Sequence, residues 1–244
     1  DPPSFWHEHF DQIYQIPYRC LYSQNISNLL FAGRNISQTH VALSSSRVMA
    51  TCATMGQAVG TAAALCIRHR TIPSDVGKKY LNELQEQLLR DDAFIPLRPA
   101  KDSKDLAKGA TKILASSTST GNTKHLTDGV SRDENGTVHH WASDRLPAEI
   151  TMEWENPVDL SAIMIKCDTN LKRNIMMLKY YREDKAYSHS VPKELLKALT
   201  VEARVADQWI QLGSMDNNRK RLIKFNFNKT NLNGFKILRH MLVE

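Results

Sequence analysis

The sequence predicts an α+β protein, with a largely helical first part followed by an all-β sandwich of the jelly-roll type. Two observations predict the first part: a short apolar run at residues 28–32 and a helix of small residues at 51–70, with a long polar loop between them. One observation predicts the second part. From residue 148 onward, apolar and polar side chains alternate in short segments, as they do in half-buried strands.

The other elements are predicted in chain order. Residues 13–21 are expected to form a strand region with an edge position or bend at Pro17, because proline cannot donate to a sheet ladder. Residues 75–91 are expected to form a helix whose leucines recur at helical spacing. Strands are expected at residues 148–154, 160–166, 176–181, 199–205, 209–212, 221–227 and 234–238.

The helix predicted at 51–70 has an unusual composition. Gly56 and Gly60 each cost up to about 1 kcal/mol relative to alanine inside a helix, and they lie four residues apart on one face. Such a face admits a flat ligand or another backbone at close range. Tight packing on a sheet without any ligand would explain the helix equally well. Thr51 and Thr54 are candidate N-caps.

Several ordered motifs of this region resemble one enzyme family. They comprise residues 16–19, 28–34, 37–40, 46–49 and 51–60. Together they resemble the C-terminal part of the FAD-dependent oxidoreductases with two dinucleotide-binding domains, over roughly residues 13–95. The resemblance implies a fragment of an FAD/NAD(P)-binding α/β domain. It also implies that the small-residue helix points its N-terminus at the flavin ring, where its partial positive charge stabilises reduced flavin.

The resemblance implies roles for seven residues. Catalytic roles fall to His40 as acid or base and to Arg47 as anion anchor, although His40 could equally be a structural histidine. The FAD-binding residues are Arg34, Ser37, Met55, Gly56 and Gln57. Of these, Arg34 would offset phosphate or flavin charge. The backbone N–H groups of Met55 to Gln57 would face the ring.

One part of the flavin signature is absent from the sequence. No two of the ten glycines lie two residues apart, so there is no Gly-x-Gly-x-x-Gly loop to hold the pyrophosphate on a helix N-terminus. We therefore expect a C-terminal fragment whose partner is a missing N-terminal dinucleotide-binding half. The FAD site is expected to be incomplete, and oxidoreductase activity would depend on that half.

The second part of the chain resembles another family. Residues 126–129, 141–143, 150–154, 157–160 and 209–212 resemble those of galactose-binding-like, or discoidin-like, sandwiches. The expected domains are 1–95 for the oxidoreductase part, 96–124 for a linker or early strand, and 125–244 for the sandwich. The resemblance implies a carbohydrate ligand. Trp141 with His139 and His140 would form a stacking platform, unless Trp141 belongs to the core.

Composition and motifs also bear on nucleic-acid binding, membrane spanning and metal binding. The net charge of +6 lies entirely in residues 96–244, but the one dense basic run, Arg219–Arg221, is interpreted as a solvated turn, so no nucleic acid is expected. No uninterrupted apolar run is long enough to span a membrane. The four cysteines form no Cys-x-x-Cys pair. Asp128 and Gly129 could hold calcium in the sandwich family, but few carboxylates are nearby, and no metal site is predicted.

These observations lead to two functional hypotheses, beside a third in which the chain is a purely structural fragment with no activity alone. In the first, the chain is part of an FAD-dependent oxidoreductase, which supplies the flavin-facing helix and an accessory β-sandwich, and acts on a small-molecule substrate that the sequence does not identify. In the second, the chain is a carbohydrate-binding accessory module without catalytic activity. The sequence leaves the cellular compartment open.

Overall fold

A computed structural model describes residues 13–169, 192 and 194–242 of the chain, with side chains described up to residue 238. The chain divides into two compact units, Asp1–Ala100 and Lys101–Glu244. Helices make up the first unit and antiparallel strands dominate the second, so the predicted α+β class is confirmed. Each unit is described by itself below.

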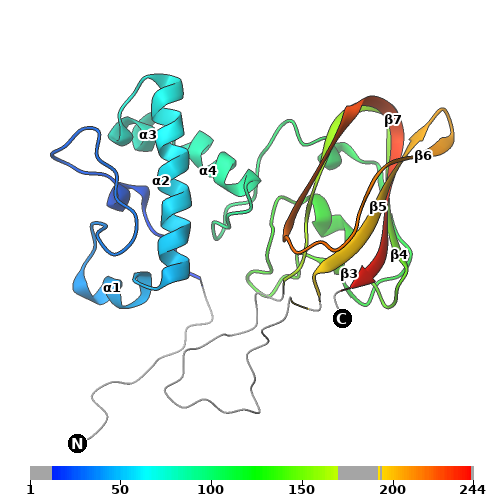
Figure 1. Cartoon of the computed structure of the whole chain (residues 1–244), viewed down its shortest axis with the longest axis horizontal. Helices are drawn as coiled ribbons and strands as arrows, with labels where there is room; N and C mark the ends of the chain where they lie inside the picture. The colour runs from blue at the N-terminus through cyan, green and yellow to red at the C-terminus, as the bar shows by residue number, and fades with distance from the viewer. Residues whose placement is uncertain (1–12, 170–191, 193, 243–244) are drawn as a thin grey trace, which may run out of the picture. The chain divides into compact units, whose positions relative to one another are not determined.

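The first unit is built around one long helix. Its elements are η1 (Tyr18–Leu21), α1 (His40–Ser46), α2 (Met49–His69), α3 (Pro73–Lys79) and α4 (Leu81–Arg90). Figure 1 shows α1 beside the N-terminal end of α2, and α3 near its other end. One side of α2 packs on α3 and α4 through a buried cluster, composed of Ala62, Leu65, Val76, Leu84 and Leu88.

Three predicted features of this unit differ in the structure. The strand expected at 28–32 is only an isolated bridge between Tyr22 and Leu30, because a strand needs a sheet and the described residues of this unit form none. The extended segment at 13–21 ends in η1. The helix expected at 75–91 divides at Tyr80, whose ring stacks on His69 with 4.0 Å between centroids.

The second unit contains a five-stranded antiparallel sheet and a two-stranded one. The large sheet has the order β1-β4-β7-β5-β6. Its strands are β1 (Lys112–Ala115), β4 (Ala148–Lys166), β5 (Leu196–Val205), β6 (Gln208–Met215) and β7 (Leu222–Leu242). The small sheet pairs β2 (Thr120–Gly121) with β3 (Trp141–Ala142). Two short 3-10 helices complete the unit, η2 (Leu106–Gly109) and η3 (Thr123–Thr127).

Two strands are longer than predicted. The segments 148–154 and 160–166 belong to one strand, β4, whose pairing with β7 has an irregularity between Glu153 and Val158. Likewise, the predicted segments 221–227 and 234–238 belong, from Leu222 onward, to the single strand β7, which bends strongly in Figure 1. Both strands stay continuous because each pairs with the other along its length. The strand predicted at 176–181 lies outside the described residues.

Alternate residues of these strands face one apolar core. Ile150, Met152 and Trp154 of β4 lie on the same side as Val201, Ala203 and Phe235. Trp154 is only 7% exposed, and its Nε1–H donates to the carbonyl of Leu106 at 2.9 Å. The indole therefore joins η2 to the core of the sheet.

Candidate functional site

In the first unit, Cys52 joins the two segments that carry the predicted anion-binding arginines. Its Sγ lies 3.6 Å from the carbonyl oxygen of Arg47. A Cβ added at Gly33, where φ is +100°, would lie 3.9 Å from the same sulfur. The turn that carries Arg34 therefore meets the junction of α1 and α2 at Cys52. Arg34 and Arg47 are both exposed.

The start of α2 corrects one part of the flavin prediction. The helix begins at Met49 after the N-cap Val48, whose side chain makes no capping bond. The N–H groups of Met55 to Gln57 therefore lie in the second turn, paired with carbonyls four residues earlier. The prediction that Thr51 or Thr54 caps the helix is therefore wrong, whereas the contact of residues 55–57 with a flavin ring stays a prediction. The first-turn N–H groups are the ones left without intrahelical partners.

Other predicted site residues are held in different ways. His40 is the exposed first residue of α1, and the N–H of Ser37 donates to the carbonyl of Cys20. Gln57 donates from Nε2 to the carbonyl of Asp91 at 3.2 Å. Gly56 leaves open space, since a Cβ there would meet nothing within 4 Å. The side chain of Met55 is buried beside Ile36 and Leu21.

Gln38 is a candidate binding residue that was not among the predicted site residues. The hydroxyl of the buried Ser46 donates to Gln38 Oε1. Gln38 Nε2 is buried and has no hydrogen-bond partner among the described residues. Such a donor fits a ligand carbonyl or phosphate oxygen, because a buried N–H without an acceptor is costly. Its position between Ser37 and His40, within the motif at residues 37–40, could have indicated this role from the sequence.

A large apolar surface of α1 and α2 faces away from the unit's own core. Val41, Met49 and Ile67 are each more than 80% exposed. In the described part of the chain, α2 is the one helix long and apolar enough to cross a membrane by length and composition, with a mean hydropathy of 1.3. Length and composition suit a helix enclosed within a protein equally well, and α2 already packs on two helices.

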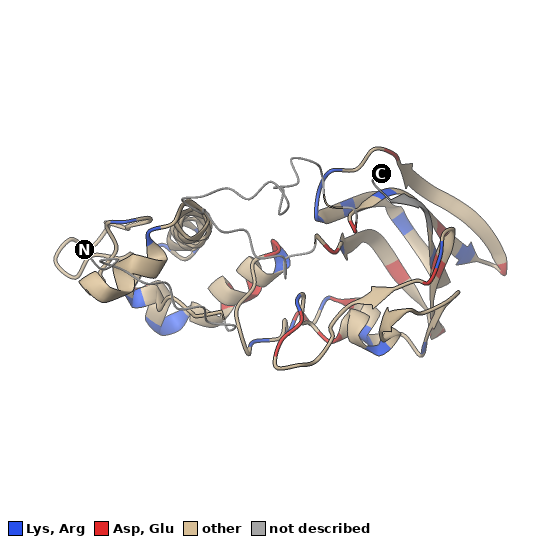
Figure 2. Cartoon of the chain, turned by 90° about the horizontal axis from the view of Figure 1, so that it is seen from below, with Lys and Arg blue, Asp and Glu red and all other residues tan. Residues whose placement is uncertain are grey.

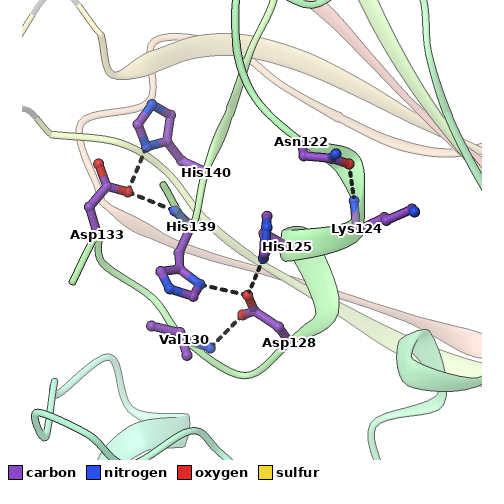
Figure 3. A network of polar contacts seen from close by, with 8 residues as sticks. All are labelled: Asn122, Lys124, His125, Asp128, Val130, Asp133, His139 and His140. Carbon is purple, nitrogen blue, oxygen red and sulfur yellow. Dashed lines mark hydrogen bonds and ion pairs between the residues drawn. The ribbon is translucent and has the colours of Figure 1, made fainter. Parts of the chain in front are cut away.

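In the second unit, one carboxylate holds two imidazoles (Figure 3). Oδ2 of Asp128 lies 2.9 Å from Nδ1 of His125 and 2.6 Å from Nδ1 of His139. Oδ1 of the same carboxylate accepts the N–H of Val130 at 2.8 Å. The side chains of Asp128 and His139 are 23% and 12% exposed, whereas that of His125 is 36% exposed. We call these three residues the His–Asp–His cluster.

Backbone contacts fix the cluster from both sides. Asn122 caps η3 by accepting the N–H of Lys124, which places His125 on the first turn. Asp133 Oδ1 accepts the backbone N–H of His139 at 2.8 Å and contacts Nδ1 of His140 at 2.9 Å.

The guanidinium of Arg221 donates to the carbonyls of Cys167 and Ser131. The basic run is thus not simply solvated, because Arg221 ties this loop to the sheet.

The predicted stacking platform is not formed. Trp141 packs against the core, and its Nε1–H donates to the Ser117 carbonyl and the Thr118 hydroxyl, each at 3.0 Å. His139 and His140 are held by carboxylates rather than placed beside an open ring. The core alternative for Trp141 is therefore the one the structure supports.

A different tryptophan is exposed on the face of the large sheet opposite its core. Trp209 is 37% exposed, and Lys236 Nζ lies 4.3 Å from the centre of its ring. Basic and acidic side chains alternate across this face, and Figure 2 shows both charges interspersed on the strands. We call it the outer sheet face, defined by Glu149, Glu153, Glu202, Arg204, Trp209 and Lys236.

Register explains how these charges meet. Glu153, Gly234 and Arg204 lie opposite one another on three adjacent strands. The guanidinium of Arg204 passes beside Gly234 and reaches Glu153 at 3.1 Å. The face presents donors and acceptors around one aromatic ring.

A family model matches the first part of the chain. Residues 3–88 match the model of a family described as FAD dependent oxidoreductase, so the resemblance predicted from the motifs is confirmed for this part. The match covers about a third of the chain. No curated protein sequence matches the chain.

Several solved structures share similarity with part of the chain. One is CpGH89CBM32-5 of Clostridium perfringens in complex with GalNAc-β-1,3-galactose, at 15% identity and TM-score 0.40, covering 57% of this chain and 89% of that one. Another is chitosan-binding module 2 of a Paenibacillus sp. IK-5 chitosanase/glucanase in complex with chitotriose. Its sequence identity is 14% and its TM-score 0.41, and the match covers 57% of this chain and 90% of that one. A third is the family 32 carbohydrate-binding module of C. perfringens NanJ in complex with galactose. Its sequence identity is 13% and its TM-score 0.38, and the match covers 54% of this chain and 83% of that one.

Proposed function

We propose that the first unit supplies the flavin-facing helix of an FAD-dependent oxidoreductase, and that the rest of the FAD site comes from a dinucleotide-binding segment absent from this sequence. The observation that carries the proposal is the junction at Cys52. There, Arg34 and Arg47 flank a helix start without a side-chain cap. Cations and free N–H groups together suit the anionic edge of reduced flavin.

The exposed apolar surface supports the second half of the proposal. Side chains such as Val41 and Met49 are seldom left so exposed on a helix that a protein uses alone. The open glycine face at Gly56 and Gly60 admits a backbone or planar ring at close range. Gln38 Nε2 offers a further donor. The described groups therefore fit part of an FAD, while the pyrophosphate loop must come from elsewhere.

The native protein tests this proposal. It is isolated with an antibody raised against residues 101–244, and its intact mass and visible absorption are measured. We expect a polypeptide larger than 27.7 kDa that carries the absorption bands of oxidised flavin and releases FAD on denaturation. A colourless native polypeptide of 27.7 kDa, isolated without any flavin-carrying companion chain, would overturn the proposal.

Substitution of the two arginines tests the site itself. In the native protein, Arg34→Ala combined with Arg47→Ala is expected to raise the dissociation constant for FAD roughly a hundredfold or more, because charge-assisted hydrogen bonds contribute about 1.5–3 kcal/mol each. Arg70→Ala, at the other end of α2, is the matched control. Equal FAD affinity in all three proteins would rule out these arginines as binding groups.

We also infer that the outer sheet face of the second unit binds a neutral carbohydrate. Trp209 supplies an apolar ring for a sugar face. The surrounding carboxylates and cations supply acceptors and donors for hydroxyl groups. The three acidic and two basic groups nearly balance, which favours a neutral ligand over a charged one.

Sugar affinity chromatography and calorimetry test this second candidate. The probes are galactose, N-acetylgalactosamine and chitotriose, the sugars named with the structures above. Trp209→Ala is expected to weaken binding roughly tenfold by removing the ring, and Trp209→Phe is expected to restore most of it. Leu114→Ala is the control, since Leu114 is an exposed side chain of the same sheet. Wild-type retention in Trp209→Ala, or no retention of the wild type, would refute this placement.

A further inference from the structure

We propose that the His–Asp–His cluster of the second unit is a binding site for a divalent late transition metal, for which Zn²⁺ is the representative ion. One ligand atom from each of His125, Asp128 and His139 lies within 4.8 Å of the others. The three residues come from η3, its C-cap and the segment before β3. The site is independent of FAD.

The donor atoms decide the class of metal. Two imidazole nitrogens with one carboxylate oxygen are ligands that Zn²⁺ and its neighbours prefer, whereas Ca²⁺ and Mg²⁺ prefer sites made only of oxygen. Each imidazole would bind through Nδ1 and carry its proton on Nε2. The calcium role considered for Asp128 from the sequence therefore gives way to a different ion.

The observed distances are those of the metal-free form. Oδ2 of Asp128 lies within hydrogen-bonding distance of both Nδ1 atoms. Around a tetrahedral zinc with bonds of about 2.0–2.1 Å, neighbouring donors lie about 3.4 Å apart. A metal would replace the two shared protons, and each distance from Asp128 Oδ2 to an Nδ1 atom would lengthen by less than about 1 Å. His125 is the most exposed of the three side chains, and the shorter contact, between Asp128 and His139, would have to open as well.

The backbone supports a site that is already assembled. The Val130 N–H orients the Asp128 carboxylate through its other oxygen, and Asp133 anchors the main chain at His139. Such outer contacts fix ligand orientation and commonly govern metal affinity. Three protein ligands leave a fourth position of a tetrahedral ion for water or another small ligand.

Binding of Zn²⁺ and Ca²⁺ to the full chain tests the proposal by calorimetry and equilibrium dialysis. We expect the wild type to bind one more Zn²⁺ per chain than the His125→Ala, His139→Ala double variant. Each single variant should raise the dissociation constant at this site at least about 100-fold, since even outer contacts change metal affinity 10–100-fold. Ca²⁺ is expected not to compete. Zinc bound by other histidines would remain in the double variant.

His140→Asn is the matched control, because it removes the neighbouring imidazole, which contacts Asp133 and not the cluster. It should keep the extra zinc. Circular dichroism of His125→Ala, the most exposed position, checks that the variant is folded. Identical zinc stoichiometry and affinity in the wild type and the double variant would overturn the proposal, as would binding of Ca²⁺ in preference to Zn²⁺.

Discussion

Gly121→Ala is expected to destabilise the second unit by about 2–5 kcal/mol. A Cβ at this position would lie 1.7 Å from the carbonyl oxygen of His140, and the glycine has φ +79°. Alanine therefore meets both a left-handed backbone and a clash with main chain that no rotamer can relieve. The pairing of Thr120 with Ala142 and of Gly121 with Trp141 would be lost.

Urea unfolding followed by tryptophan fluorescence measures this change, because Trp141, Trp154 and Trp209 all lie in the second unit. Gly136→Ala is the matched control. Its φ is +76°, but a Cβ there would meet nothing within 4 Å, so only the backbone penalty of about 1–2 kcal/mol applies. Equal losses in the two variants would show that the contact with His140 does not constrain the fold.

Trp154→Ala is expected to cost the second unit about 3–5 kcal/mol. The indole is 7% exposed, and its ring lies 5.7 Å from that of Phe235 between centroids. Its removal leaves a cavity, and the Leu106 carbonyl loses the Nε1–H donor that holds η2 to the sheet. Calorimetric unfolding of the full chain measures the loss, since the fluorescence signal changes with the substitution.

Trp209→Ala is the control for this second variant, because it removes the same side chain from the outer sheet face. We expect a loss below about 1 kcal/mol there, since surface substitutions have small effects. Trp154→Phe should recover part of the stability by filling the cavity while leaving the Leu106 carbonyl without its donor. Comparable losses for Trp154→Ala and Trp209→Ala would contradict the burial that separates them.

The position of the elements could largely be predicted from local patterns. The small-residue helix and the alternating segments after residue 148 are periodic, and periodicity reports which face of an element is buried. The motifs between residues 16 and 60 also predicted the family that matches residues 3–88. The residues at which the elements begin and end could not be predicted as well. The start of α2 at Met49 and the division at Tyr80 depend on neighbours that no local pattern encodes.

The polar sites show more clearly what could not be predicted from the sequence. His125 and Asp128 are three residues apart, but His139 joins them only because a turn and the β2–β3 pairing return the chain. Trp141 packs against the core, whereas Trp209 is exposed on the outer sheet face. Which tryptophan is available to a ligand depends on long-range pairing, and sequence spacing does not determine that pairing.

The order of the large sheet also sets the timing of its formation during synthesis. β7, the last of the described strands, lies between β4 and β5. Until β7 emerges from the ribosome, no strand lies between the β1–β4 pair and the β5–β6 pair to join them into one sheet. The pairing of β4 with β7 joins residues far apart in the chain, which favours slow folding. Nascent chains that stall before residue 222 would expose unfinished sheet edges, a substrate for chaperones and an aggregation risk.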